Sequence, residues 1–202
     1  MKRRSVLWLV RLLNTMIAVA FFVTGLAADS SSLIAMSLVS ASDSFAYTSA
    51  LATPVRSMAW KLGAARASGL VLVGVSIGVA IDALRRLVEG SDPLGTTMIL
   101  MAVVAGIVNI VSLWLLRRTE SPAVPVHTAR PFTAIVLAAN GSIVVGGTLV
   151  LWLGTNLPDL VIGITVAGVA VQIGLETLVG AHERVRGDVR PLPPPDRDDP
   201  NR

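Results

Sequence analysis

The polar side chains that could do chemistry in this chain gather in one otherwise apolar segment, residues 31–52. Five of them are related to one another by steps of three and four residues: Ser37, Ser40, Asp43, Ser44 and Tyr47. This spacing places them along one face of a helix. A carboxylate at the centre of a membrane span costs about 2.5–3.5 kcal/mol on insertion scales. Asp43 is therefore predicted to face the interior of a helical bundle, either as a cation or proton site or as a neutral, hydrogen-bonded residue that packs helices.

Other polar residues have plainer interpretations. Three Asn residues lie within apolar segments: Asn14, Asn109 and Asn140. Asn side chains form hydrogen bonds between helices in lipid, which is the expected role of the first two, whereas Asn140 is also a candidate site residue. Asp82 precedes Arg85 and Arg86 by three and four residues, which predicts a local ion pair. Asp159 is expected to stabilise the positive end of the helix that begins beside it.

The elements that must position these residues are membrane-spanning helices. Hydrophobic residues make up 53% of the 202-residue chain and charged residues only 15%, with a mean hydropathy of +0.70, whereas soluble domains carry about 25% charged residues. A spanning helix needs about 20 mostly apolar residues, and six segments qualify: 6–28, 31–52, 64–88, 94–116, 132–153 and 158–180. The predicted fold class is an all-α membrane protein, a six-helix transmembrane bundle over residues 1–182 with no soluble C-terminal domain. Residues 183–202, rich in Pro and Asp, are expected to be a disordered cytoplasmic tail.

The placement of Lys and Arg predicts the orientation. All but two of the 17 lie in the N-terminal segment, the second and fourth connections, or the tail, and the exceptions are Arg85 and Arg86. Because positive residues accumulate on the cytoplasmic side of a membrane, both termini are expected in the cytoplasm. The expected location is the plasma membrane. A cleaved signal peptide at residues 1–28 is an alternative that would leave five spans in the same orientation.

Several functions are not expected. The sequence pI of about 10.6 suggests nucleic acid as a partner, but the basic residues form no patch interleaved with aromatics. The chain has no cysteine, which excludes disulfides and thiolate sites. We find no Ser/His/Asp set, no metal-ligand cluster and no phosphate-binding glycine loop, so no enzyme activity and no resident cofactor are predicted. Small residues between 163 and 174 predict close helix packing.

The sequence resembles the cation diffusion facilitator (cation efflux) family, and most closely its small members that consist of the transmembrane domain alone. Residues 12–47 read LLNTMIAVAFFVTGLAADSSSLIAMSLVSASDSFAY, similar to the first two helices of that family. Further matches lie in order along residues 5–182: Arg85-Arg86-Leu87, Asp92-Pro93, Asn109, Asn140-Gly141-Ser142 and Pro158-Asp159-Leu160-Val161. The resemblance implies a six-helix bundle that exports divalent cations such as zinc in exchange for protons, and a possible homodimer in the lipid bilayer.

The resemblance also implies a metal site between the second and fifth helices, and this sequence departs from its pattern. Family members place a His or Asp on each of these helices and an Asp four residues later. Here Asp43 matches the second ligand and Val39 replaces the first. On the fifth helix, either Asn140 takes the Asp position with Val136 four residues earlier, or Ala138 takes it and no polar ligand remains. The metal site is therefore expected to be degenerate, with Asp43 and Asn140 as its remaining residues.

Two functions follow as alternatives. The first is a divergent transporter that moves a cation or protons by means of Asp43, for which oxygen ligands would suit a harder ion than zinc. The second is a non-transporting homologue that serves as a membrane scaffold or partner subunit.

Overall fold

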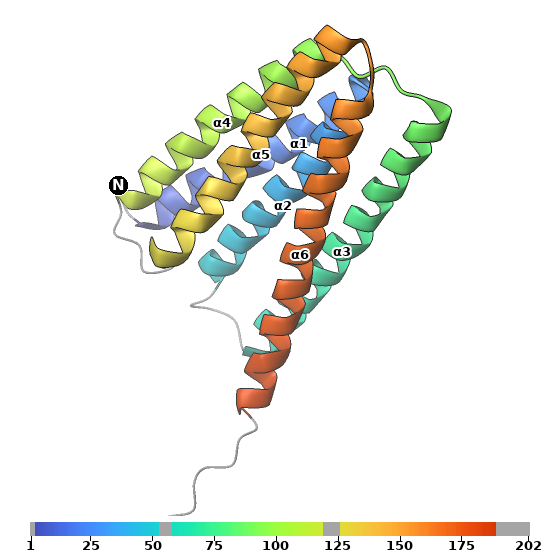
Figure 1. Cartoon of the computed structure of the whole chain (residues 1–202). Coiled ribbons are helices and arrows are strands. Elements are labelled where there is room, and N and C mark those ends of the chain that lie inside the picture. Colours follow the sequence, from blue (N-terminus) through green and yellow to red (C-terminus); the bar gives the residue numbers. More distant parts are fainter. Residues whose placement is uncertain (1–2, 53–57, 119–125, 189–202) are drawn as a thin grey trace, which may run out of the picture.

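The structure, a computed structural model, describes residues 3–52, 58–118 and 126–188. Within these ranges the chain forms six helices in antiparallel succession (Figure 1). Their bounds are α1 Arg3–Ala27, α2 Ser31–Ala52, α3 Met58–Glu89, α4 Gly95–Arg117, α5 Val126–Leu153 and α6 Leu157–Asp188. The two ends of the bundle differ. We call the end with the three connections α1–α2, α3–α4 and α5–α6 the turn end, and the opposite end, which carries Arg4, Arg11, Arg66, Arg117 and Arg118, the basic end.

Five of the six helices are long and apolar enough to cross a membrane, judged over the described residues: α1, α3, α4, α5 and α6. The chain is therefore built as a multi-pass membrane protein. The exception is α2, which contains several serines and Asp43. It packs against α1, α3 and α6 and, over a short stretch, against α5, so it occupies the centre of the bundle (Figure 1). Since its neighbours cover much of its surface, α2 needs less apolar side chain than a helix that faces lipid.

The helices differ from the predicted segments mainly at the basic end. There α3 and α5 each begin six residues earlier than predicted, and α6 continues to Asp188. Residues 183–188 are therefore helical, contrary to the expectation of a disordered tail, while residues 189–202 lie outside the described part. Apolar length reveals only the part of a helix that is buried in lipid, so these extensions gave no signal in the hydropathy.

The three connections at the turn end are short. Gly90 and Gly154 follow α3 and α5 with φ of +89° and +62°, the left-handed conformation in which glycine commonly ends a helix. Their backbone N–H groups donate to Arg86 O and Val150 O, at 2.9 and 3.0 Å. Asp29, between α1 and α2, also has a positive φ, of 49°.

Glycines allow the closest helix contacts. A Cβ on Gly147 of α5 would lie 2.7 Å from Gly95 O of α4, and one on Gly174 of α6 would lie 2.6 Å from a methyl group of Val73 on α3. A Cβ on Gly163 would lie 2.9 Å from Ser31 of α2. The predicted packing role of the small residues in α6 is thus confirmed for Gly163 and Gly174. It is not confirmed for Gly168, where a Cβ would meet nothing within 4 Å.

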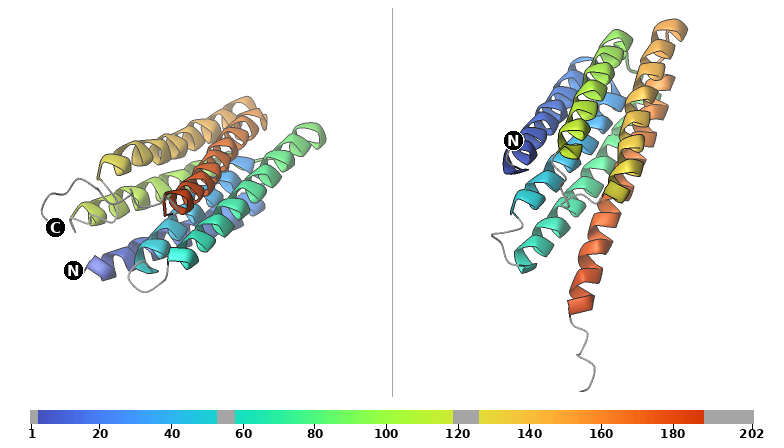
Figure 2. Two further views of the ribbon diagram at one scale, coloured as in Figure 1. Left: turned by 90° about the horizontal axis from the view of Figure 1, so that it is seen from below. Right: turned by 90° about the vertical axis from the view of Figure 1, so that its left-hand side faces the viewer.

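The helix pairings also differ from the family pattern. The resemblance implies that α2 and α5 lie side by side, but α5 packs chiefly against α4 and less extensively against α6, and touches α2 only briefly (Figure 2). The more extensive partners of α2 are α1 and α6. The main hydrophobic core includes Phe21 of α1, Met36 of α2, Met98 of α4, Ile143 of α5 and Ala167 of α6.

Candidate functional site

Asp43 lies on the buried face of α2, past the middle of the helix toward the basic end. Its residue exposure is only 8%, and Val39 and Ser40, on the same face, are also buried. No hydrogen bond or ion pair joins its carboxylate to another described side chain or backbone group. A buried carboxylate normally has a hydrogen-bond or charge partner, because burial without one is costly. Asp43 is therefore a largely buried carboxylate that has no hydrogen-bond or ion-pair partner among the described residues.

Asn140 lies on the buried face of α5, with Val136 one turn before it. Ala138, the alternative candidate, is exposed, so α5 turns Val136 and Asn140 inward and Ala138 outward. The Asn140 amide nitrogen donates to Val136 O at 3.0 Å within the same helix. Its Oδ1 is buried and accepts no hydrogen bond from any group that the structure describes. Asn140 thus presents a free acceptor oxygen to the interior of the bundle.

One turn before each of these two residues lies an apolar side chain. Val39 and Val136 both belong to the main hydrophobic core. Asp43 is 12 residues from the start of α2 and Asn140 is 13 residues from the end of α5, which places them about 18 and 20 Å from the turn-end termini of their helices at 1.5 Å per residue. No group of three His, Cys, Asp or Glu residues that could hold a metal ion occurs among the side chains described. Asp43 and Asn140 can each offer oxygen atoms to a proton or a small cation, and they do not supply the four ligands of a zinc site.

The other two asparagines do not act as predicted. The Asn14 side chain donates to Val10 O at 2.9 Å within α1, so its nitrogen does not bridge helices. Asn109 of α4 is half-buried, and the described contacts include no hydrogen bond from its side chain to another helix. For Asn14 the expectation of an interhelical bond fails because its amide reaches the carbonyl one turn earlier on its own helix.

A second polar cluster lies at the turn end and centres on Asp159. This residue of α6 is fully buried and accepts four hydrogen bonds from the start of α2. Its Oδ1 accepts from Ser30 Oγ at 2.6 Å, from Ser32 Oγ at 2.6 Å and from Ser32 N at 3.1 Å, and its Oδ2 accepts from Ser31 N at 2.7 Å. Asp159 therefore caps the N-terminus of α2 as well as lying in the first turn of its own helix.

Arg86 of α3 forms ion pairs within its own helix and with the α1–α2 turn at the turn end. As predicted, Asp82 pairs with both arginines that follow it, with Arg85 at 3.2 Å and with Arg86 at 2.6 Å. Arg86 also forms a salt bridge to the Asp29 carboxylate and donates to Asp29 O at 2.9 Å. Asp29 in turn accepts from Asp92 N at 3.0 Å.

The α5–α6 connection joins the same cluster through Asn156, which donates to Ser91 Oγ at 2.9 Å. The backbone N–H of Leu94 adds a bond to Ala28 O at 3.0 Å. All three connections at the turn end are thus linked by side-chain and backbone hydrogen bonds. The sequence predicted the ion pairs inside α3 but not these long-range links. The three consecutive serines before an apolar run, Ser30 to Ser32, were an available signal only for the cap at the start of α2.

Comparison with known proteins adds no assignment. The sequence matches no protein-family model, and no curated protein matches it. The identification of the site therefore rests on the residues and their geometry.

Proposed function

We propose that the chain is a six-span protein of the plasma membrane with both termini in the cytoplasm. Five helices have the length and apolarity to span, and α2 runs antiparallel between them (Figure 1). The described basic residues of α1, α3 and α4 other than Arg85 and Arg86 lie at the basic end, which the positive-inside tendency assigns to the cytoplasm. The turn end, which carries Asp29, Asp82, Glu89, Asp92 and Asp159, would face outward.

We further propose that the protein is a cation transporter that resembles the proton-coupled divalent metal exporters. The observation that carries this proposal is the buried Asp43 carboxylate, which no described group pairs or hydrogen-bonds. A carboxylate in such a place is characteristic of proton and cation pathways in membrane proteins. The free Oδ1 of Asn140, on a helix that touches α2, offers a second oxygen ligand. An oxygen-only set favours a hard cation or a proton over zinc.

Transport by everted membrane vesicles tests this proposal. Vesicles with the wild-type protein are expected to take up a cation, or to exchange it for protons, as followed with a metal-sensitive or pH-sensitive dye across Mg²⁺, Mn²⁺, Ca²⁺ and Zn²⁺. Asp43→Asn should abolish the flux, because the neutral amide cannot exchange a proton or balance a cation's charge. Ser42→Ala, one residue away and on the side of α2 that faces α3, is the matched control and should transport normally. Equal flux for wild type and Asp43→Asn with every cation would contradict the proposal.

A non-transporting role as a membrane scaffold or partner subunit is the second candidate. The observation that favours it is that two apolar residues, Val39 and Val136, occupy positions where the family has metal ligands, and both are buried in the hydrophobic core. It predicts that a stable partner protein co-purifies from native membranes and that reconstituted protein alone shows no flux. Flux by the purified protein in liposomes would decide for transport.

A further inference from the structure

The buried side chain of Asn14 on α1 has the same arrangement as that of Asn140 on α5. Each residue is only 3% exposed. Each amide nitrogen donates to the carbonyl one turn earlier on its own helix, that of Asn14 to Val10 O at 2.9 Å and that of Asn140 to Val136 O at 3.0 Å. A carbonyl oxygen can only accept, so these bonds fix which amide atom is the nitrogen and leave Oδ1 free of the helix backbone. No described group donates to the Oδ1 of either residue.

Asn14 and Asn140 lie at the depth of Asp43 in the bundle. Asn14 is 13 residues before the end of α1, Asn140 is 13 residues before the end of α5, and Asp43 is 12 residues after the start of α2. All three are therefore about 18–20 Å from the turn-end termini of their helices, at 1.5 Å per residue. Since a hydrocarbon core is about 30 Å thick, this depth is well inside the membrane.

The three residues also face the same part of the interior. Asn14 is eleven residues, or about three turns, before Gly25. A Cβ on Gly25 would lie 2.8 Å from Ile34 of α2, so Asn14 is on the face of α1 that packs against α2. One neighbour of each polar residue, three or four positions away, belongs to the main hydrophobic core: Ile17, Val39 and Val136. Asn14, Asp43 and Asn140 therefore border one core from three helices.

The charge of these side chains decides which ion suits them. The buried acidic residues of the described part are Asp43 and Asp159, and Asp159 is hydrogen-bonded at the turn end. Arg11, three residues before Asn14, lies over the Trp8 ring at 4.7 Å. One carboxylate and two amide oxygens thus carry a single negative charge. A monovalent cation balances it, whereas a divalent cation would leave one positive charge without a partner in an apolar interior, which is costly.

We propose that Asn14, Asp43 and Asn140 bind one alkali cation, such as Na⁺, through the Asp43 carboxylate and the two amide oxygens. The inference rests on the proposed cation site at Asp43, to which it adds Asn14 as a ligand and a preference for a single positive charge. The ion pairs a carboxylate that has no ion-pair partner among the described residues, and it joins α1, α2 and α5 at one depth.

Thermal unfolding of the full-length protein in dodecyl maltoside tests the binding without any measurement of flux. NaCl or KCl replaces choline chloride at constant ionic strength and at a fixed alkaline pH, where few protons compete for the carboxylate. Once the alkali cation exceeds its dissociation constant about fivefold, the melting temperature of the wild type should rise by about 2–4 °C. MgCl₂ and CaCl₂ should raise it less. Asp43→Asn should abolish the rise, because no negative charge remains.

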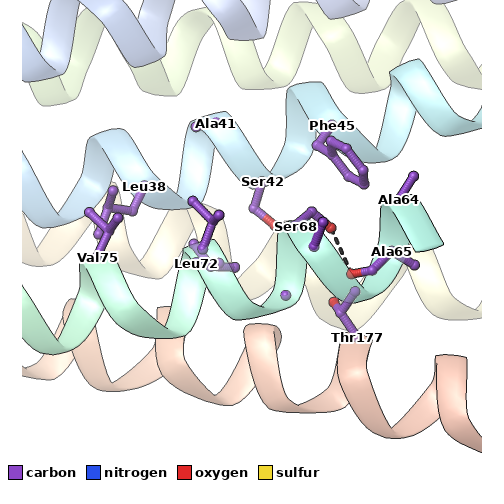
Figure 3. Close-up of a pocket in the computed structure, with 13 residues that line it drawn as sticks. Leu38, Ala41, Ser42, Phe45, Ala64, Ala65, Ser68, Leu72, Val75 and Thr177 are labelled. Carbon is purple, nitrogen blue, oxygen red and sulfur yellow. Dashed lines mark hydrogen bonds between the residues drawn. The ribbon is translucent and has the colours of Figure 1, made fainter. Parts of the chain in front are cut away.

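Asn14→Leu tests the added ligand and keeps the bulk of the side chain. The cation concentration that gives half of the rise should increase about tenfold, the lower end of the cost of losing a residue that supports a metal site. Thr15→Val is the matched control, since Thr15 is adjacent on α1 but exposed and donates to Arg11 O within the helix. Ser42→Ala is a second control, because Ser42 lines a groove between α2 and α3 on another face of α2 from Asp43 (Figure 3). Both controls should respond like the wild type.

Asn14→Asp tests the charge and gives a result even where Asn14→Leu fails to fold. A second carboxylate gives the site two negative charges, so the largest rise should move from the alkali cations to Ca²⁺ or Mg²⁺. The proposal would be overturned by a wild type that neither Na⁺ nor K⁺ stabilises, by equal half-rise concentrations for the wild type and Asn14→Leu, or by an unchanged ion preference in Asn14→Asp.

Two results separate this inference from the proposed transport function. A larger rise with a divalent cation in the wild type would overturn the inference and leave transport standing. A rise with Na⁺ that depends on Asp43 and Asn14, in a protein without Asp43-dependent flux of any cation, would support the site and contradict transport.

Discussion

Replacing Asp159 by Asn should destabilise the bundle far more than its change of a single atom suggests. Asp159 accepts four hydrogen bonds from Ser30, Ser31 and Ser32 and is fully buried. The amide of Asn keeps one acceptor oxygen. Placed at the Oδ1 position, that oxygen retains three of the four bonds, but the new NH₂ group then faces the N–H of Ser31. Two donors oppose each other, and the first turn of α2 loses an acceptor.

The expected magnitude follows from these contacts. One buried N–H without an acceptor costs about 1–3 kcal/mol, and the three retained bonds weaken because bonds to a charged acceptor are roughly twice as strong as neutral ones. Together they predict a loss of about 2–4 kcal/mol in the free energy of unfolding. Asp159→Ala leaves the N–H groups of both Ser31 and Ser32 unpaired and should cost about 2–6 kcal/mol.

Unfolding in mixed micelles of dodecyl maltoside and SDS, followed by circular dichroism, measures this loss. Asp92→Asn is the matched control, since Asp92 is exposed and takes part in the turn-end contacts through its backbone N–H. It should unfold like wild type. A double-mutant cycle between Asp159→Asn and Ser32→Ala should show a coupling energy, because each removes part of the same bond. Unfolding of Asp159→Asn within about 0.5 kcal/mol of Asp92→Asn, the usual range for neutral surface changes, would refute the capping role.

Three further predictions concern packing, the turn-end cluster and topology. Gly147→Val should lower the free energy of unfolding by about 1–3 kcal/mol through overpacking against Gly95. The control Gly106→Ala, where a Cβ meets nothing within 4 Å, should change the unfolding midpoint little. Equal midpoints for the two variants would contradict the close approach of α4 and α5. Arg86→Gln should lower the free energy of unfolding by about 1–3 kcal/mol, because it removes charged hydrogen bonds to the α1–α2 turn. Cleavage of that turn by an added protease should become faster. An unchanged cleavage rate would count against the contact between Arg86 and the turn. A green fluorescent protein fused to either terminus should fluoresce and alkaline phosphatase fused there should be inactive, and the opposite pattern at one terminus would show that the proposed topology is wrong.

The sequence predicts the helices well where lipid dictates their composition. For α4 the predicted segment 94–116 differs from the observed Gly95–Arg117 by one residue at each end, since Pro93 and Arg117 mark the limits of the apolar run. The bounds of α2 were also predicted correctly, although α2, unlike the other five helices, is not apolar enough over its described residues to qualify as a span. Helix extensions beyond the apolar run, such as the start of α3 at Met58, carry no hydropathy signal and were not predicted.

The candidate site was predictable in part, for a related reason. A carboxylate in an apolar helix must turn inward, so the buried position of Asp43 follows from its cost in lipid. Which residues lie opposite depends on how α2 and α5 pack, and helix packing is not contained in the pattern of either helix alone. The same limit hid the role of Asp159, whose partners Ser30 and Ser32 are 129 and 127 residues away along the chain.

That separation has a consequence for how the protein is made. The ribosome delivers α2 early, while the carboxylate that caps its first turn arrives only when α6 is synthesised. Until then the N–H groups of Ser31 and Ser32 lack their native acceptor at a point where the helix borders the membrane. The central helix of the bundle therefore reaches its final state last, after nearly the whole chain has been inserted. Nascent chains truncated before α6 should consequently be targets of membrane quality control, although they contain every residue of α2.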